Sequence, residues 1–233
     1  MNVNRLVLWD IDLTLISAAA LGASWYGEAL RRYAGTQLVH LPSFAGRTER
    51  AITTELLTAH GLDTGNGSVE RFFAELEAVA AEQGDQLAEH GRALPGAEAA
   101  LKALTERTEV AQTVATGNLP TIARQKLAAF GLDDYLDFEI GGYGTLTERR
   151  EDLVAAAIAA AGRKHSTVFA PRNVVVIGDT PADVAGALAH DVTAVAVATG
   201  HYDVEQLRAA GAHVVLPDLA DTGAVLSAVL GEN

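Results

Sequence analysis

Short apolar runs, each ended by turn-forming residues, recur along the chain and alternate with longer segments in which apolar residues follow helical spacing. Apolar runs of this length are typical of strands that are buried on both faces of a sheet. The pattern predicts strands at residues 5–9, 110–115, 138–140, 173–177, 193–197 and 213–216. No run approaches the roughly 20 apolar residues that a membrane span requires, so we expect no membrane contact.

The segments between the later strands have the spacing of amphipathic helices. In residues 97–107, Ala97, Ala100, Leu101 and Leu104 recur at helical spacing and would share one face. The pattern predicts further helices at residues 121–130, 152–161 and 181–190. Strands and helices in alternation predict an α/β fold, with a Rossmann-like parallel sheet and helices on both of its faces.

Residues 17–92 interrupt this alternation, because they contain three helical patterns and no convincing strand. The patterns cover residues 18–33, 48–60 and 69–83. We therefore predict an α/β core of residues 1–16 and 93–233, with an inserted α-helical cap domain at residues 17–92. Ligands of doubly wound sheets bind beyond the carboxyl ends of the strands, so an insert that leaves from such an end would cover the ligand as a lid.

Composition narrows the classes of function. The chain has 17 basic and 30 acidic residues, a net charge of -13 and no visible basic stripe, which argues against a nucleic-acid partner. It contains no cysteine, so disulfides and thiolate metal sites are excluded. The N-terminus has no signal-peptide pattern, so we expect a cytoplasmic protein. The sequence does not indicate an oligomeric state.

Two carboxylates, Asp10 and Asp12, follow the first predicted strand. Aspartate is common after strands because its side chain bonds nearby backbone in turns, so the pair alone is weak evidence of a functional site. Side chains two positions apart in extended chain project the same way. Both carboxylates would therefore be able to face one ligand.

Polar residues also follow other predicted strands. Thr116, Gly117 and Asn118 follow the second strand, where they would either bind a phosphate or cap the next helix. Asp179 and Asp183 follow the fourth strand, where they would either cap the next helix or bind a cation. Four carboxylates at one edge of a sheet are costly without a cation, and hard oxygen ligands suit Mg²⁺.

A basic pair, Arg149 and Arg150, lies shortly after the glycine-containing loop 141–144. An arginine from this segment would be able to contact both the aspartates and a phosphate, although a charged pair at a helix start is more often simply solvated. The loop is not a dinucleotide-binding fingerprint, because it lacks the third glycine at the right spacing and the helix start that faces a pyrophosphate.

Taken together and in this order, three segments resemble the haloacid dehalogenase superfamily: DIDLT at residues 10–14, TGN at 116–118 and GDTPAD at 178–183. The similarity is to the phosphoglycolate-phosphatase-like branch, which carries a helical cap after the first motif, and it covers nearly the whole chain. Residues 44–49, FAGRTE, resemble the substrate-facing loop of that cap, which implies a specificity role for Arg47 and Thr48.

The sequence departs from the family pattern at two points. Leu13 stands where the family usually has a glycine, and we expect this change to be tolerated because both aspartates and Thr14 are retained. The usual Lys-Pro of the third motif is absent. The resemblance then implies that Arg150, or with less support Arg149, supplies the third-motif cation.

The resemblance implies a phosphomonoester hydrolase that acts on a small soluble metabolite through an aspartyl phosphate. Asp10 would be the nucleophile and Asp12 the general acid and then the base. The implied Mg²⁺ ligands are Asp10, the backbone carbonyl of Asp12 and Asp179, with Asp183 in support. The implied phosphate-binding residues are Thr116, Gly117, Asn118 and Arg150.

Three alternatives remain at this stage. A phosphomutase of the beta-phosphoglucomutase type would share every core motif. A dehalogenase should not need Asp179 and Asp183 for a metal, and a phosphometabolite sensor has no use for an acid next to a nucleophile. The sequence does not name the substrate, because the cap sets specificity in this family.

Overall fold

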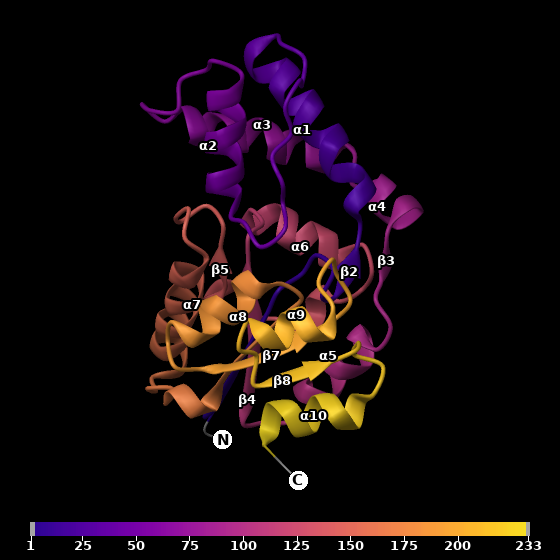
Figure 1. Ribbon diagram of the computed structural model, residues 1–233, viewed down its shortest axis with the longest axis vertical. Coiled ribbons are helices and arrows are strands. Elements are labelled where there is room, and N and C mark those ends of the chain that lie inside the picture. Colours follow the sequence, from indigo (N-terminus) through magenta and orange to yellow (C-terminus); the bar gives the residue numbers. More distant parts are fainter. Residues whose placement is uncertain (1–2, 232–233) are drawn as a thin grey trace.

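A computed structural model describes residues 3–231 of the 233-residue chain. Its centre is a six-stranded sheet in which all neighbouring strands are parallel (Figure 1). The order across the sheet is β5-β4-β1-β6-β7-β8. In chain order these strands are β1 (Arg5–Trp9), β4 (Val110–Thr116), β5 (Gly142–Tyr143), β6 (Val174–Gly178), β7 (Thr193–Val197) and β8 (Val214–Leu216). The predicted α/β class is confirmed.

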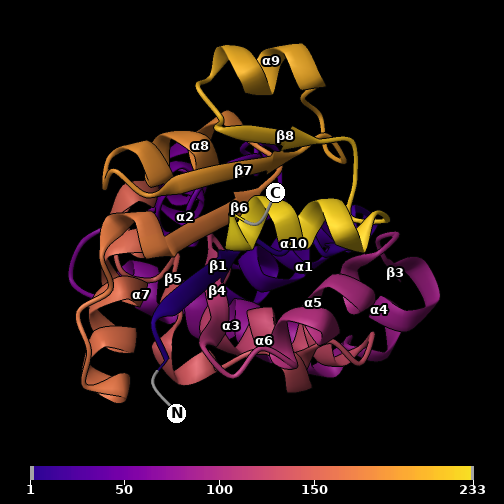
Figure 2. The ribbon, with the colours of Figure 1, turned by 90° about the horizontal axis from the view of Figure 1, so that it is seen from below.

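Strand β1 lies between β4 and β6, and its side chains alternate between two apolar cores. Val7 and Trp9 belong to one core, and Leu6 and Leu8 belong to the other. The first core includes residues of α5 (Ala97–Thr105), α6 (Pro120–Ala128) and α10 (Thr222–Leu230). The second includes residues of α7 (Arg150–His165), α8 (Pro181–Leu188) and α9 (Val204–Ala209). Figure 2 shows α5 and α10 on one side of the sheet and α7 and α8 on the other, so the prediction of helices on both faces is also confirmed.

Residues 19–90 form a helical insert above the sheet (Figure 1). Its helices are α1 (Ala19–Ala34), α2 (Glu49–Ala59), α3 (Ser68–Glu82) and the short α4 (Asp85–His90). The first three match the predicted helical patterns, whereas α4 is not among the predicted elements. The chain enters and leaves the insert through β2 (Ile16–Ser17) and β3 (Arg92–Ala93), which pair antiparallel as a separate two-stranded sheet. The two crossings between core and insert therefore lie side by side.

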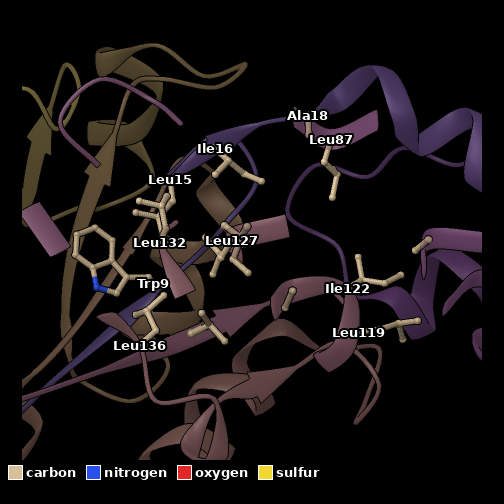
Figure 3. Close-up of a cluster of buried hydrophobic side chains, with 14 of the residues drawn as sticks. Trp9, Leu15, Ile16, Ala18, Leu87, Leu119, Ile122, Leu127, Leu132 and Leu136 are labelled. Carbon is tan, nitrogen blue, oxygen red and sulfur yellow. The ribbon is translucent and has the colours of Figure 1, made fainter. Parts of the chain in front are cut away.

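One apolar cluster continues from the sheet into the insert. Figure 3 shows it extending from Trp9 through Leu15 and Ile16 to Ala18 and Leu87. All five side chains are buried. In this arrangement the insert packs on the core through shared apolar surface as well as through the two chain crossings.

The prediction of a strand at residues 138–140 is wrong. Those residues form a 3₁₀ turn, η2 (Phe138–Ile140), and the edge strand is the two-residue β5 that follows. The carboxylate of Asp137 accepts a hydrogen bond from the Glu139 N–H at 3.1 Å, which favours a turn at that point. Gly142 begins β5 where a Cβ atom would lie 2.0 Å from the Leu153 carbonyl oxygen. The edge strand needs a glycine there because α7 approaches closely.

Smaller differences concern the remaining elements. Two further 3₁₀ turns, η1 (Asp133–Tyr135) and η3 (Pro171–Asn173), join the regular elements, and α9 and α10 are absent from the sequence prediction. Of the helices that the structure describes, none combines the length and the apolar character that crossing a membrane would require.

Candidate active site

The register of the central strands brings three strand ends to one place. Trp9, the last residue of β1, lies opposite Val114 of β4 and Ile177 of β6. The next residue, Asp10, continues this pairing, because its N–H donates to the Ile177 carbonyl at 2.8 Å. Strand β6 continues one residue beyond this level and β4 two residues, so the residues that follow the three strands lie around one crevice.

Three carboxylates meet at this point. Asp10, Asp179 and Asp183 are buried, and one oxygen of each lies within 4.8 Å of the others. Burial raises the pKa of Asp10 to about 6, with Arg150 opposing this change. Burial, followed by the charges of Asp10 and Asp183, raises the pKa of Asp179 to about 8. The cluster therefore carries more negative charge than its protein surroundings compensate.

Asp183 supports the cluster from the first turn of α8. One carboxylate oxygen accepts hydrogen bonds from the Thr180 N–H at 3.1 Å and the Thr180 hydroxyl at 2.6 Å. The Thr180 hydroxyl in turn accepts from the Asp183 N–H at 3.2 Å, which completes a capping box. The other oxygen accepts from Arg150 Nε at 2.8 Å. Asp183 is thus fixed both by its own helix and by α7.

Arg150 is the member of the basic pair that reaches the carboxylates. Its side chain is 9% exposed and lies 2.8 Å from an oxygen of Asp10. Burial disfavours its charge, but Asp10 and Asp183 more than offset this and raise the pKa of Arg150. The side chain of Arg149 is 68% exposed and pairs with Glu151 at 2.8 Å. Of the two candidates for the third-motif cation, Arg150 is therefore the one that contacts the carboxylates, and its role stays a prediction.

The carboxylate of Asp12 lies outside the acidic cluster and is held by other groups. Lys126 Nζ lies 2.8 and 2.7 Å from its two oxygens, and the Asn118 amide donates to it at 2.8 Å. Lys126 also donates to the Asn118 side-chain oxygen at 2.7 Å. Burial would raise the pKa of Asp12, but Lys126 and Asn118 lower it below its usual value. In this state Asp12 is an ion-paired carboxylate of fixed orientation.

Sequence reasoning missed Lys126, although a signal was present. Lys126 is four residues after Ile122 on α6, and residues at this spacing share a helix face. Both residues line the same cavity. A lysine on the inward face of a helix that starts beside a phosphate-binding candidate would have been a reason to include it.

Leu13 adopts a left-handed backbone conformation, with φ of 60°. This conformation costs a residue with a side chain roughly 1–2 kcal/mol relative to the right-handed region. The surrounding bonds hold it: the Leu13 N–H donates to the Ile16 carbonyl at 2.7 Å, and the Thr199 hydroxyl donates to the Leu13 carbonyl at 2.5 Å. Leu13 thus adopts a backbone conformation that ordinarily favours glycine, the residue usual in the family at this position.

The residues after β4 link the core to the insert. Thr116 is buried, and its hydroxyl oxygen accepts from the Asn118 side-chain amide at 2.8 Å. The Gly117 carbonyl accepts a hydrogen bond from the Glu49 N–H of α2 at 2.8 Å. A Cβ atom on Gly117 would lie 2.0 Å from the Arg47 carbonyl oxygen. The insert therefore touches the core directly over the strand ends.

The two specificity candidates of the insert are engaged within the insert itself. The Arg47 guanidinium lies 2.7 Å from a carboxylate oxygen of Glu55 and donates to the Ala51 carbonyl at 3.1 Å. Thr48 is the N-cap of α2, where its hydroxyl accepts from the Ala51 N–H at 3.3 Å. Neither side chain is free in this arrangement, and their substrate roles stay predictions.

Sequence reasoning also missed Glu49, a buried acid of the insert. The Tyr26 hydroxyl lies 2.5 and 2.6 Å from its two carboxylate oxygens, and the Thr53 hydroxyl donates to one of them at 3.0 Å. Burial raises the pKa of Glu49 to about 7, although these hydrogen bonds oppose the change. Glu49 and Tyr26 both line the cavity above the strand ends.

That cavity lies between core and insert. The core contributes polar side chains, among them Asp10, Asp12, Thr116, Asn118, Lys126, Arg150 and Asp179. The insert contributes mainly apolar side chains, among them Leu21, Trp25, Phe44, Ile52, Leu76 and Leu87. The candidate site is thus a charged floor of core residues under an apolar cover.

Comparison with known proteins assigns the chain to a family. The family model of haloacid dehalogenase-like hydrolases matches residues 5–191. The chain belongs to this family. Among curated proteins, none matches it significantly.

Solved structures resemble this haloacid dehalogenase-like hydrolase over nearly its full length. A predicted phosphatase from Clostridium acetobutylicum has a TM-score of 0.69 and 20% identity, over 97% of this chain and 100% of its own. A predicted phosphoglycolate phosphatase from Haemophilus somnus has a TM-score of 0.64 and 16% identity, over 97% and 99% of the two chains. A candidate beta-phosphoglucomutase from Bacteroides vulgatus has a TM-score of 0.67 and 16% identity, over 99% and 90%. At such identities the likeness concerns the fold.

The structure of this haloacid dehalogenase-like hydrolase brings the core candidates together in two groups. One group is the carboxylate cluster with Arg150, and the other is Asp12 with Asn118 and the unpredicted Lys126. The insert candidates Arg47 and Thr48 join neither group through their side chains. Their contribution to the site in this state comes from the loop backbone, which rests on Gly117.

Proposed function

We propose that this haloacid dehalogenase-like hydrolase is a Mg²⁺-dependent phosphomonoester hydrolase that acts on a small phosphate ester through an aspartyl phosphate. The observation that carries the proposal is the placement of Asp10. Its carboxylate lies at the end of the central strand, in a buried cluster, against the guanidinium of Arg150. A nucleophile in this position needs positive charge around it to meet an anionic phosphate.

The residues of the cluster fit a divalent cation. Three buried carboxylates share one arginine, and the raised pKa values of Asp10 and Asp179 reflect this shortage of positive charge. Asp10, Asp179 and the backbone carbonyl of Asp12 would hold Mg²⁺, with Asp183 in support. When bound, the ion supplies the charge that lets an anionic nucleophile approach a phosphate.

The protein's own groups account for the proposed chemistry. An oxygen of Asp10 forms a bond to phosphorus while the bond from phosphorus to the leaving oxygen breaks. Asp12, after taking up a proton, delivers it to that leaving oxygen. Asp12 then accepts a proton from water as the water attacks the aspartyl phosphate, which releases phosphate and restores Asp10. Arg150, Thr116 and the amides after it hold the phosphoryl oxygens throughout.

The ion pair with Lys126 suits one half of this cycle directly. It keeps Asp12 ionised, which is the form that accepts a proton from water. For the first half, the proton must reach Asp12 before or during substrate binding. Because Asn118 and Lys126 fix the side chain, Asp12 serves both steps from one orientation.

A screen of phosphate release over phosphomonoesters in the presence of Mg²⁺ tests the proposal. We expect turnover that disappears with excess chelator and returns with Mg²⁺. Asp10→Asn should abolish it, because an amide is a poor nucleophile. If the folded variant kept a tenth or more of the wild-type rate, which is about 1.4 kcal/mol of barrier, Asp10 would not be the nucleophile. Recovery of an isomeric sugar phosphate without free phosphate would establish a phosphomutase instead.

A further inference from the structure

The part of the cavity that would receive the leaving group is predominantly apolar. The lining side chains from the insert include Leu21, Phe44, Ile52, Leu76 and Leu87. The ring of Tyr26 packs against that of Phe44, with a centroid distance of 5.1 Å. An apolar wall stabilises apolar groups and offers nothing to a charged group that loses its water on entry.

No lysine or arginine that lines the cavity within residues 3–231 is left without an acidic partner. Arg150 is paired with Asp10, Lys126 with Asp12, and Arg47 with Glu55. The remaining basic side chain of the lining, His201, is exposed. A second negative charge on the substrate, beyond the phosphate, would therefore have to displace an existing ion pair.

The described insert residues that line the cavity include one acid, Glu49. It is 6% exposed, and the hydroxyls of Tyr26 and Thr53 hold it in place. Its three carboxylate hydrogen bonds come from neutral hydroxyls, two from Tyr26 and one from Thr53, and within residues 3–231 the structure gives it no ion pair. Above pH 7, where Glu49 is ionised, an anionic leaving group would meet this carboxylate among mainly apolar side chains, where like charges repel strongly.

We infer that the natural substrate is a phosphate monoester of an apolar, uncharged alcohol, and that Glu49 excludes leaving groups that carry a second negative charge. The inference rests on the proposed function and narrows its substrate class. It places the specificity at Glu49, whereas the family resemblance implied a specificity role for Arg47 and Thr48. Specificity of this kind comes from an element that disfavours the wrong ligand as well as from contacts to the right one.

A matched series of alkyl phosphates, assayed at pH 8 where Glu49 is ionised, tests the substrate class. The esters share one chain length and end in a methyl group, a carboxylate or an ammonium group, so that the reacting oxygen is similar in all three. We expect kcat/KM for the methyl ester to exceed that for the carboxylate ester by at least about tenfold, a difference of about 1.4 kcal/mol. The ammonium ester should also fall below the methyl ester, because its charge loses water among apolar side chains while Glu49 remains bonded to Tyr26 and Thr53. A carboxylate or ammonium ester that equals or surpasses the methyl ester would overturn the inference.

Variants at Glu49 test whether this residue excludes leaving groups that carry a second negative charge. Glu49→Gln keeps an oxygen acceptor for Tyr26 but removes the charge, so kcat/KM for the carboxylate ester should rise at least about threefold relative to the methyl ester. Glu49→Asp keeps the charge and should retain the wild-type preference. Glu89→Gln makes the same change of charge at an exposed residue of α4 and should leave the ratio unaltered. An unchanged ratio in folded Glu49→Gln would show that Glu49 does not exclude anions.

A generic substrate separates failure of this inference from failure of the proposed function. Each protein is also assayed with p-nitrophenyl phosphate and Mg²⁺. Absence of turnover by the wild-type protein with this ester and with the whole series would overturn the proposed phosphatase activity. Turnover of p-nitrophenyl phosphate together with a preference for the carboxylate ester would leave the phosphatase activity standing and overturn only the inference.

Discussion

At the level of single residues, the chemistry depends on how the carboxylate of Asp12 is held. Lys126 contacts both of its oxygens, and Asn118 contacts Lys126 as well as Asp12. This closed set of three side chains leaves the carboxylate little freedom to rotate. A general acid that is already oriented loses less entropy when it reaches the transition state.

We predict that Lys126→Met impairs both proton transfers of Asp12, because the side chain is no longer held in one orientation. For alkyl phosphates, whose leaving oxygen needs a proton, kcat/KM should fall at least about tenfold. For p-nitrophenyl phosphate it should fall less, because nitrophenolate leaves without a proton. Lys102→Met, at an exposed position of α5, is the matched control and should change neither value. Equal losses with both substrate types would show that Lys126 does not act through the acid.

Glu49 supplies a second residue-level prediction, which concerns stability. Its pKa rises from 4.5 to about 7 on folding, so the folded protein binds this proton more tightly than the unfolded chain. The contribution of Glu49 to the free energy of unfolding is therefore greatest at low pH and is lost as the pH rises through about 7. We expect the free energy of unfolding of the wild type, relative to Glu49→Gln, to fall by up to about 3 kcal/mol between pH 4.5 and pH 8. Chemical denaturation of both proteins across this pH range measures it, and a pH-independent difference would contradict it.

At the level of elements, the start of α2 is the main contact between insert and core at the site. The N–H groups of Glu49 and Arg50 donate to the carbonyls of Gly117 and Gly144, at 2.8 and 2.9 Å. The first N–H groups of a helix have no partner within the helix. Here core loops supply those partners, so the closed arrangement satisfies the helix end.

We predict that Gly117→Ala disturbs this closure. Its methyl group would lie 2.0 Å from the Arg47 carbonyl oxygen, a backbone atom, so the insert would have to move away. We expect kcat/KM to fall at least about tenfold, because the cover no longer excludes water from the site. Gly65→Ala is the control within the insert, since a methyl group there makes only an ordinary contact at 3.6 Å. Wild-type kinetics for Gly117→Ala would show that closure does not need this approach.

Comparison of the predicted with the observed elements shows which features of the fold could be predicted from the sequence. Long apolar runs such as β6 and the alternation with helices could be predicted, because burial dictates both. The two-residue strand β5 could not, since its two residues show no periodicity and the close approach of α7 determines where it lies. The motif aspartates could be predicted from their places after strands. Lys126 was missed although its spacing from Ile122 on α6 was a signal. Glu49 could not be predicted, because the packing of α2 against Tyr26 decides where its side chain points.

At the level of the whole molecule, two paired crossings of the chain join the helical insert to the core. Ile16 of β2 pairs with Ala93 of β3, and the Leu94 N–H donates to the Leu15 carbonyl at 2.8 Å. Two adjacent crossings permit rotation of the insert as a unit. The division into an α/β core and a helical cap therefore stays a prediction with a definite place for its hinge.

Metal binding should affect the stability of the whole molecule, because the acidic cluster joins the ends of β1 and β6 with α8. Mg²⁺ that binds only the folded protein should stabilise it, by about 2.7 kcal/mol when the free ion is at 100 times its Kd. Asp179→Asn removes one carboxylate and relieves repulsion, so the variant should melt at a higher temperature than the wild type without metal. It should also lose most of the Mg²⁺-induced rise in Tm. Asp134→Asn, at an exposed position, is the control and should match the wild type in both respects. Thermal melts with and without Mg²⁺ measure these shifts, and a full Mg²⁺ response in Asp179→Asn would place the ion elsewhere.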